Sequence, residues 1–93
     1  MLRFEWDENK NRKNIAKHGI DFKMATQVFE DERLLEFPDD QHSEYEERYL
    51  AIGNVKHMIM ILTVVYTERG DAIRIISARR ATKREEARYH AGF

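Results

Sequence analysis

The fold is decided by residues 57–78, HMIMILTVVYTERGDAIRIISA, which predict two strands joined by a tight turn. Residues 57–67 are apolar and rich in β-branched side chains, a pattern typical of a central strand buried on both faces. The following Glu68-Arg69-Gly70-Asp71 has the polar, glycine-containing composition of a hairpin turn. Residues 72–78 predict the returning strand, so an antiparallel hairpin forms the centre of the expected sheet.

Shorter strands flank this hairpin. Residues 2–6 alternate between apolar and polar side chains, which predicts a first strand. Residues 33–37 predict another, ended by Pro38, and a polar, acidic loop follows over 39–47. Residues 48–52 alternate again and precede a turn at Gly53-Asn54.

Three helices are predicted, each preceded by a side chain that can accept hydrogen bonds from the first backbone N–H groups. They span residues 8–17 after Asp7, residues 22–30 after Asp21, and residues 83–90 after Thr82. Gly19 follows the first helix, where a left-handed residue commonly ends a helix. Thr82 and Glu85 have the spacing of a capping box. The expected order is β-α-α-β-β-β-β-α, an α+β fold with the helices on one face of an antiparallel sheet.

The composition excludes several protein classes. A chain of 93 residues with 42% hydrophobic and 35% charged residues is expected to form one domain, spanning residues 1–93. It contains no run of 18 apolar residues and no basic-then-apolar leader, so neither a membrane span nor a secretion signal is predicted. The absence of cysteine excludes disulfides, thiolate nucleophiles and cysteine metal sites, and a cytoplasmic location is expected.

The net charge of −1 hides an uneven distribution. Residues 1–18 carry +2 and residues 79–93 carry +3, whereas residues 19–48 carry −7. Two basic ends around an acidic middle are consistent with an anionic ligand and a separate partner surface, or simply with solvated faces.

Most motifs for enzyme chemistry are missing. The chain has no glycine-rich phosphate loop, its serines have no nucleophile motif, and its four histidines lack metal-ligand spacing. We therefore predict no metal site and no cofactor. The alternative left open is a divalent cation in the acidic loop.

Cations are concentrated around the last predicted helix. They are Arg79, Arg80, Lys83, Arg84 and Arg88. On a helix Arg84 and Arg88 share a face, where like charges repel unless an anion lies between them. Guanidinium groups bind phosphate bidentately, but Glu85 and Glu86 can also neutralise them on a solvated helix. Tyr89 is either a stacking or proton-donating group or a half-buried ring.

The first helix carries a second set of polar side chains. Lys10, Asn14 and Lys17 recur at helical spacing, and His18 stands beside Lys17. Histidine is the side chain that titrates near neutrality when unperturbed. Either this stripe faces a phosphate chain, or it is solvated and His18 caps the end of the helix.

These segments together resemble the BrnT toxin family. The resemblance rests on FEWD at residues 4–7, Lys10, Asn14 and KHGIDF at residues 17–22. It continues through VVYTER at residues 64–69 and RIISARRAT at residues 74–82, followed by Arg84-Glu85. It covers nearly the whole chain, and residues 31–47 match least specifically.

The resemblance implies the toxin half of a type II toxin–antitoxin pair with a RelE-like ribonuclease fold. It further implies metal-independent RNA cleavage that halts translation. The implied partner is a BrnA-like antitoxin that binds both DNA and the toxin, so that the complex represses its own operon; the toxin itself would reach operator DNA only through this antitoxin.

The resemblance implies that the ends of the first helix and the last strand line the RNA site. Metal-free cleavage there needs a base, an acid and a group that stabilises the phosphate, and we assign these roles to the side chains above. Arg79, supported by Arg80, would stabilise the pentavalent phosphate, and His18 would transfer the proton, with Tyr89 as the alternative. The groups expected to position the RNA backbone are Lys10, Lys17, Lys83, Arg84 and Arg88. A non-catalytic regulatory module that binds a protein or nucleic acid remains the alternative function.

Overall fold

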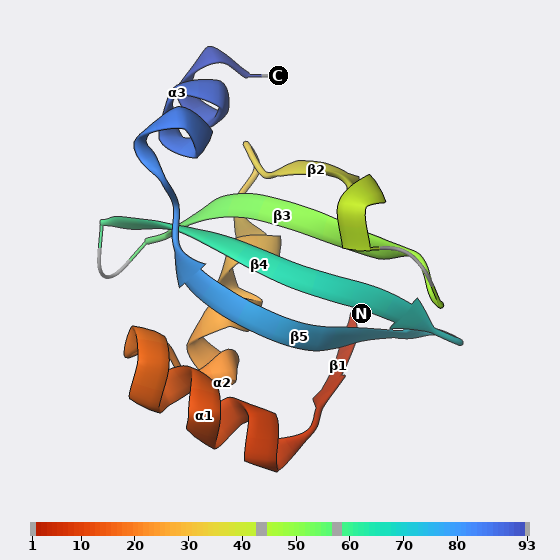
Figure 1. Cartoon of the computed structure of the whole chain (residues 1–93). Coiled ribbons are helices and arrows are strands. Elements are labelled where there is room, and N and C mark those ends of the chain that lie inside the picture. The colour runs from red at the N-terminus through yellow and green to blue at the C-terminus, as the bar shows by residue number, and fades with distance from the viewer. Residues whose placement is uncertain (1, 43–44, 57–58, 93) are drawn as a thin grey trace.

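The computed structural model describes residues 2–42, 45–56 and 59–92. These form an α+β fold, as predicted, with a five-stranded sheet, three α-helices and two 3-10 helices (Figure 1). In chain order the elements are β1 (Arg3–Trp6), α1 (Glu8–His18), α2 (Phe22–Ala25), η1 (Thr26–Glu30), β2 (Leu35–Pro38), η2 (Asp40–His42), β3 (Arg48–Val55), β4 (Met60–Arg69), β5 (Ala72–Arg80) and α3 (Lys83–Ala91).

The sheet is mixed, so the prediction of an antiparallel sheet is wrong for one strand. Its order is β1-β5-β4-β3-β2, and β1 pairs in parallel with β5 while the other neighbours are antiparallel. Alternation of apolar and polar residues shows which face of a strand is buried. It does not show the direction of the neighbouring strand, so the pattern in residues 2–6 could not distinguish parallel from antiparallel pairing.

One face of the sheet carries the main core. Phe22, Val28, Leu62, Val64 and Ile75 are fully or almost fully buried there, between the sheet and the elements α1, α2 and η1. The expected second helix is α-helical for only four residues and continues as the 3-10 helix η1. Together with η2 in the expected loop, η1 makes the observed order of elements differ from the predicted one.

The predicted turn at Gly53-Asn54 is wrong, because both residues lie inside β3 and pair with Leu62 and Ile61. The glycine serves packing instead. A Cβ atom at Gly53 would lie 2.9 Å from the Cβ of Val28, so only glycine lets η1 approach the strand this closely.

Helix α3 lies on the opposite face, which corrects the expectation that all helices share one face (Figure 1). The side chains of successive strand residues point to opposite faces. Leu62 faces the core, and the next residue, Thr63, donates a hydrogen bond to Glu85 of α3 at 3.0 Å. A capping box identifies where a helix begins but not which face of a sheet it covers.

Helix ends follow the sequence closely, and strand ends less so. Asp7 caps α1, Gly19 ends it at φ 72°, and Thr82 and Glu85 form the predicted capping box. Strands β4 and β5 extend two residues beyond their predicted ends, and the expected strand residues His57 and Met58 lie outside the described part. In the described part, no helix is long and apolar enough to cross a membrane.

Candidate nucleic-acid interface

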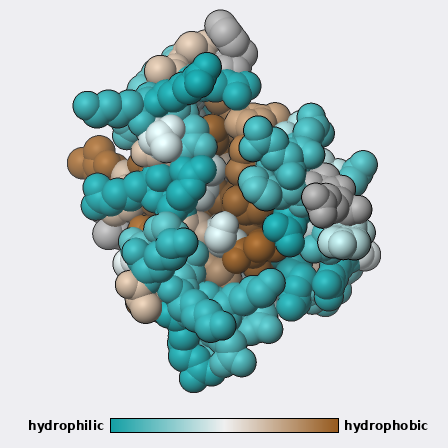
Figure 2. Space-filling model, in the orientation of Figure 1, coloured by the Kyte–Doolittle hydropathy of each residue, from teal (hydrophilic) through white to brown (hydrophobic). Residues whose placement is uncertain are grey.

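The face of the sheet that carries α3 is only partly covered, and a groove of about 370 Å³ remains on it. Leu50, Val65 and Ile76 line it with apolar side chains, and Ser77 and Arg79 of β5 add polar groups. Figure 2 shows this hollow as apolar surface framed by hydrophilic side chains. A concave surface with an apolar floor and a cation at its edge suits a nucleic-acid strand, whose bases have flat aromatic faces and whose backbone is anionic.

Arg79 lies at the edge of this groove and forms a bidentate ion pair with Glu85. Its Nη1 donates to Oε1 at 2.7 Å and its Nη2 to Oε2 at 3.0 Å. About a third of the Arg79 side chain is exposed, and that of Glu85 is mostly buried. The guanidinium is thus held in one orientation, with part of its surface facing solvent.

Glu85 is the centre of a wider hydrogen-bond network. Its carboxylate accepts from Thr63, from the backbone N–H of Thr82 and from Arg79. Burial opposes ionisation, but these donors together lower the pKa of Glu85 to about 2. The pair with Glu85 in turn raises the pKa of Arg79. One carboxylate therefore fixes both the start of α3 and the phosphate-binding candidate Arg79.

We expect this network to make folding stability sensitive to acid. The pKa of Glu85 is depressed in the folded state, so its contribution is complete above the ordinary value of 4.5 and is lost as the pH falls toward about 2. Glu85→Gln should therefore be less stable than the wild type at pH 7 and lose less stability over that interval. Urea unfolding at several pH values measures this, with Glu86→Gln as the control. Parallel pH profiles for wild type and Glu85→Gln would contradict the assignment.

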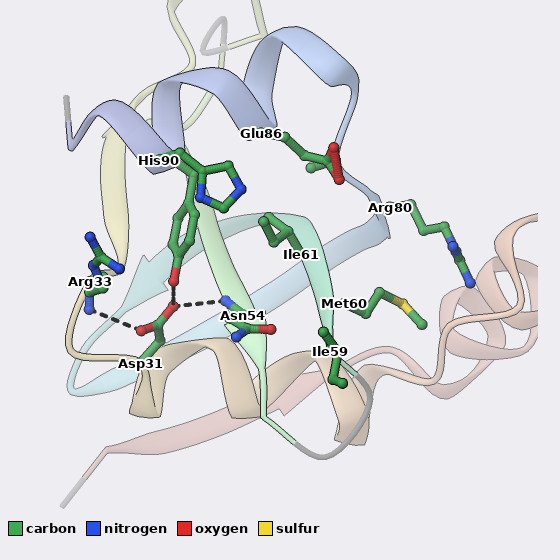
Figure 3. A pocket seen from close by; sticks show the side chains of 11 residues that line it. Asp31, Arg33, Asn54, Ile59, Met60, Ile61, Arg80, Glu86 and His90 are labelled. Atoms are coloured by element: carbon green, nitrogen blue, oxygen red, sulfur yellow. Dashed lines mark hydrogen bonds between the residues drawn. The ribbon is translucent and has the colours of Figure 1, made fainter.

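Arg80 and Tyr89 both line a different hollow, a cavity of about 610 Å³ next to α3 (Figure 3). Tyr89 is buried, and its hydroxyl donates to Asp31. Burial and the hydrogen bond to this carboxylate raise the pKa of Tyr89 to about 12. The phenol therefore keeps its proton near neutral pH, which makes it a poor base.

The side chains of the predicted polar stripe on α1 differ in their exposure to solvent. Lys10 and Lys17 are exposed and His18 is half-buried. Asn14 is buried, so the interpretation that placed it with them on a solvated or phosphate-facing stripe is wrong for this residue. Its carboxamide donates to the carbonyls of Ile20 and Ala78 and accepts from the Ala78 N–H. Helical spacing alone cannot separate a polar anchor from a surface group.

Asn14 determines where the end of α1 lies. Its bonds to Ala78 join α1 to the residue directly before Arg79. The last turn of α1, with Lys17 and His18, is therefore held near the end of β5. Lys10 lies one turn before Asn14, farther from this junction.

The remaining predicted cations lie on α3. Lys83 and Arg84 are exposed on its first turn. Arg88 is also exposed, but its guanidinium carbon lies 4.4 Å from the centre of the Phe37 ring. This cation–π contact ties α3 to β2 and gives Arg88 a structural role besides its charge.

Two further residues belong to this region but were not singled out from the sequence. The sequence predicts Glu85 only as a cap and a neutralising charge, although it stands six residues after Arg79. His90 lines the cavity beside Arg80 and Tyr89, and no motif indicated it. Within residues 2–42, 45–56 and 59–92, no group of three histidine, aspartate or glutamate side chains could hold a metal ion.

Comparison with known proteins gives one result. A family model described as "Ribonuclease toxin, BrnT, of type II toxin-antitoxin system" matches residues 6–85. The matched region includes α1, the whole sheet after β1, and the first turn of α3. No curated protein matches the chain.

Proposed function

Because the chain belongs to the BrnT family of ribonuclease toxins of type II toxin–antitoxin systems, we propose that it is a metal-independent endoribonuclease that inhibits translation. It acts in the cytoplasm and is neutralised by a BrnA-like, DNA-binding antitoxin. The observation that carries the proposal is the pair of adjacent arginines at the end of β5. Arg79 borders the groove and Arg80 borders the cavity.

The proposed reaction is an attack of the RNA 2′-hydroxyl on the adjacent phosphorus. The new bond forms between the 2′-oxygen and phosphorus, and the bond to the 5′-oxygen of the next nucleotide breaks. A base removes the proton from the 2′-hydroxyl, and an acid protonates the leaving 5′-oxygen. The products are a 2′,3′-cyclic phosphate and a 5′-hydroxyl end.

Each step has a candidate side chain. Arg79, with Arg80 in support, stabilises the charge that develops on the pentavalent phosphate. His18 is the preferred proton-transfer group, since Tyr89 keeps its proton near neutral pH. The RNA backbone is positioned by Lys10, Lys17, Lys83, Arg84 and Arg88. Without RNA, the guanidinium of Arg79 donates two hydrogen bonds to Glu85. An RNA phosphate must therefore share that guanidinium with the carboxylate or displace the carboxylate from it.

We expect purified protein to cleave RNA in the presence of EDTA. The reaction needs only proton transfer and charge stabilisation, for which this chain has histidine and arginine. The new 5′ ends should accept phosphate from polynucleotide kinase, and the new 3′ ends should resist a ligase that requires a 3′-hydroxyl until the cyclic phosphate has been opened and removed. Loss of cleavage in EDTA with recovery in Mg²⁺ would favour a metal nuclease. RNA that is bound but remains intact would favour the non-catalytic module.

We also expect a tight complex with a small protein encoded beside this chain, because membership in a type II toxin–antitoxin family implies an antitoxin partner. Covering the groove next to Arg79 would block RNA without refolding the toxin. Co-expression should restore growth, and the two proteins should co-purify. As a control, the neighbouring gene with a premature stop codon should not rescue. A chain that is harmless alone and binds no neighbour-encoded protein would contradict this prediction.

A further inference from the structure

The cavity beside α3 has the size and composition of a small-molecule site. Its volume of about 610 Å³ lies within the range of roughly 300–1,000 Å³ that such sites occupy. It is formed where α3 crosses the end of the β3–β4 pair, with Asp31 and Arg33 closing one side (Figure 3). The proposed roles of Arg80 and Tyr89 use only part of it.

Two opposite walls of the cavity suit a flat ring. Ile61 of β4 provides an apolar side chain on one wall and points toward α3, whereas the preceding Met60 packs against the core. Tyr89 and His90 of α3 provide two rings on the other, with centroids 5.5 Å apart and planes at 74°. Proteins that bind single-stranded RNA hold unstacked bases against such aromatic and histidine rings.

The cavity has a guanidinium group at each of two opposite ends, Arg33 at one and Arg80 at the other. The Asp31 carboxylate already accepts hydrogen bonds from Tyr89 and from the backbone N–H groups of Arg33 and Asn54. Across the described ranges, the guanidinium groups of Arg33 and Arg80 form no ion pair. Figure 3 shows these two side chains at opposite ends of the cavity, so a phosphate at the Arg80 end can pair with one guanidinium that has no carboxylate partner among the described residues.

The cavity also presents groups that can distinguish bases. The Oδ1 atom of Asn54 is buried and has no hydrogen-bond partner in the described part of the chain. A buried acceptor without a donor is unfavourable. A rotation of the Asn54 side-chain amide would turn its Oδ1 toward a donor on a ligand in the cavity. Glu86 adds a carboxylate, which accepts only. Acceptors on two sides favour a base with an exocyclic amino group.

We propose that this cavity binds one nucleotide of the RNA substrate, with its base between Ile61 and the Tyr89–His90 rings and its phosphate on Arg80. The site prefers adenine, cytosine or guanine to uracil, which lacks an amino group. This inference rests on the proposed function, because it names a subsite of the same RNA-binding region and assigns it a base preference.

Binding is tested first, without any cleavage step. The four nucleoside 5′-monophosphates are titrated into ¹⁵N-labelled protein and followed by NMR. AMP, CMP and GMP should shift the amides of Asn54, Ile61 and His90, and UMP should bind about tenfold more weakly. Ile61→Trp, which fills the space between β4 and α3, and His90→Ala, which removes an exposed ring, should each weaken binding about tenfold. Arg69→Ala, at the hairpin end of the sheet, is the control.

Cleavage is then mapped by sequencing the new 5′ ends. Asn54→Leu should reduce the preference for amino-bearing bases around the cut while cleavage continues. If nucleotides bind as described but RNA stays intact, the proposed ribonuclease activity is wrong and the cavity site stands. If RNA is cut with the same preference by wild type, Ile61→Trp and His90→Ala, and no nucleotide shifts the cavity amides, the cavity proposal is overturned.

Discussion

Arg79→Ala is expected to slow RNA cleavage by about 10²-fold or more, because it removes a positioned group that stabilises the charged phosphate in the transition state. Glu85 holds this guanidinium bidentately at 2.7 and 3.0 Å, so its orientation is fixed before RNA arrives. The measurement is single-turnover cleavage of a defined RNA by purified protein. Growth after induction gives a second readout.

Several variants separate this effect from loss of structure. Arg79→Ala leaves the Glu85 carboxylate without its ion pair, so unfolding must be measured in parallel. Arg79→Lys keeps the charge but not the bidentate geometry, and should recover only part of the activity. His18→Ala should also be slow, with a changed pH profile, whereas Arg88→Ala should lose less. Wild-type rates in folded Arg79→Ala and His18→Ala proteins would show that the site is misplaced.

Asn14→Ala is expected to lower the free energy of unfolding by about 3 kcal/mol, the largest stability effect that we predict for a single side chain. Its carboxamide makes three buried hydrogen bonds, two at 2.8 Å and one at 3.1 Å. Truncation leaves the Ala78 N–H and the carbonyls of Ile20 and Ala78 without that partner, and each such buried group costs about 1–3 kcal/mol. Urea denaturation measures the difference.

The neighbouring Lys13→Ala is the matched control, since Lys13 is exposed on the same helix. It should change stability by less than about 0.5 kcal/mol. An Asn14→Ala protein as stable as this control would contradict the anchoring role. Where Asn14→Ala still folds, a looser junction between α1 and β5 should also reduce cleavage, because His18 and Arg79 lie on either side of it.

Local signals in the sequence predicted the elements well. Asp7, Gly19 and the Thr82–Glu85 pair act within one helix end, so their effect does not depend on the rest of the fold. The hairpin of β4 and β5 was visible for the same reason, because Gly70 at φ 57° sits in a tight turn between adjoining strands. The side of the sheet taken by α3 and the parallel pairing of β1 depend on contacts between distant residues, which local pattern does not encode.

The candidate site was predicted only in part. The cations near the end of β5 were visible as a cluster, and their assignment to RNA chemistry remains a prediction. Sequence spacing could not show that Asn14 is buried, nor that Arg79 and Arg80 border two different hollows. Those facts follow from how α1 and α3 dock on opposite faces of the sheet.

The parallel pairing of β1 with β5 determines how late in translation the sheet can be completed. Arg3 lies opposite Ala72, and Trp6 opposite Ile75. Strand β1 therefore has no pairing partner until β5 has been synthesised about 70 residues later. At about 5–20 residues per second, this delay lasts several seconds. Asn14 likewise has no Ala78 to bind until that residue emerges. The junction between α1 and β5 therefore assembles only after Ala78 has left the ribosome, and the proposed ribonuclease site is not formed on a shorter nascent chain.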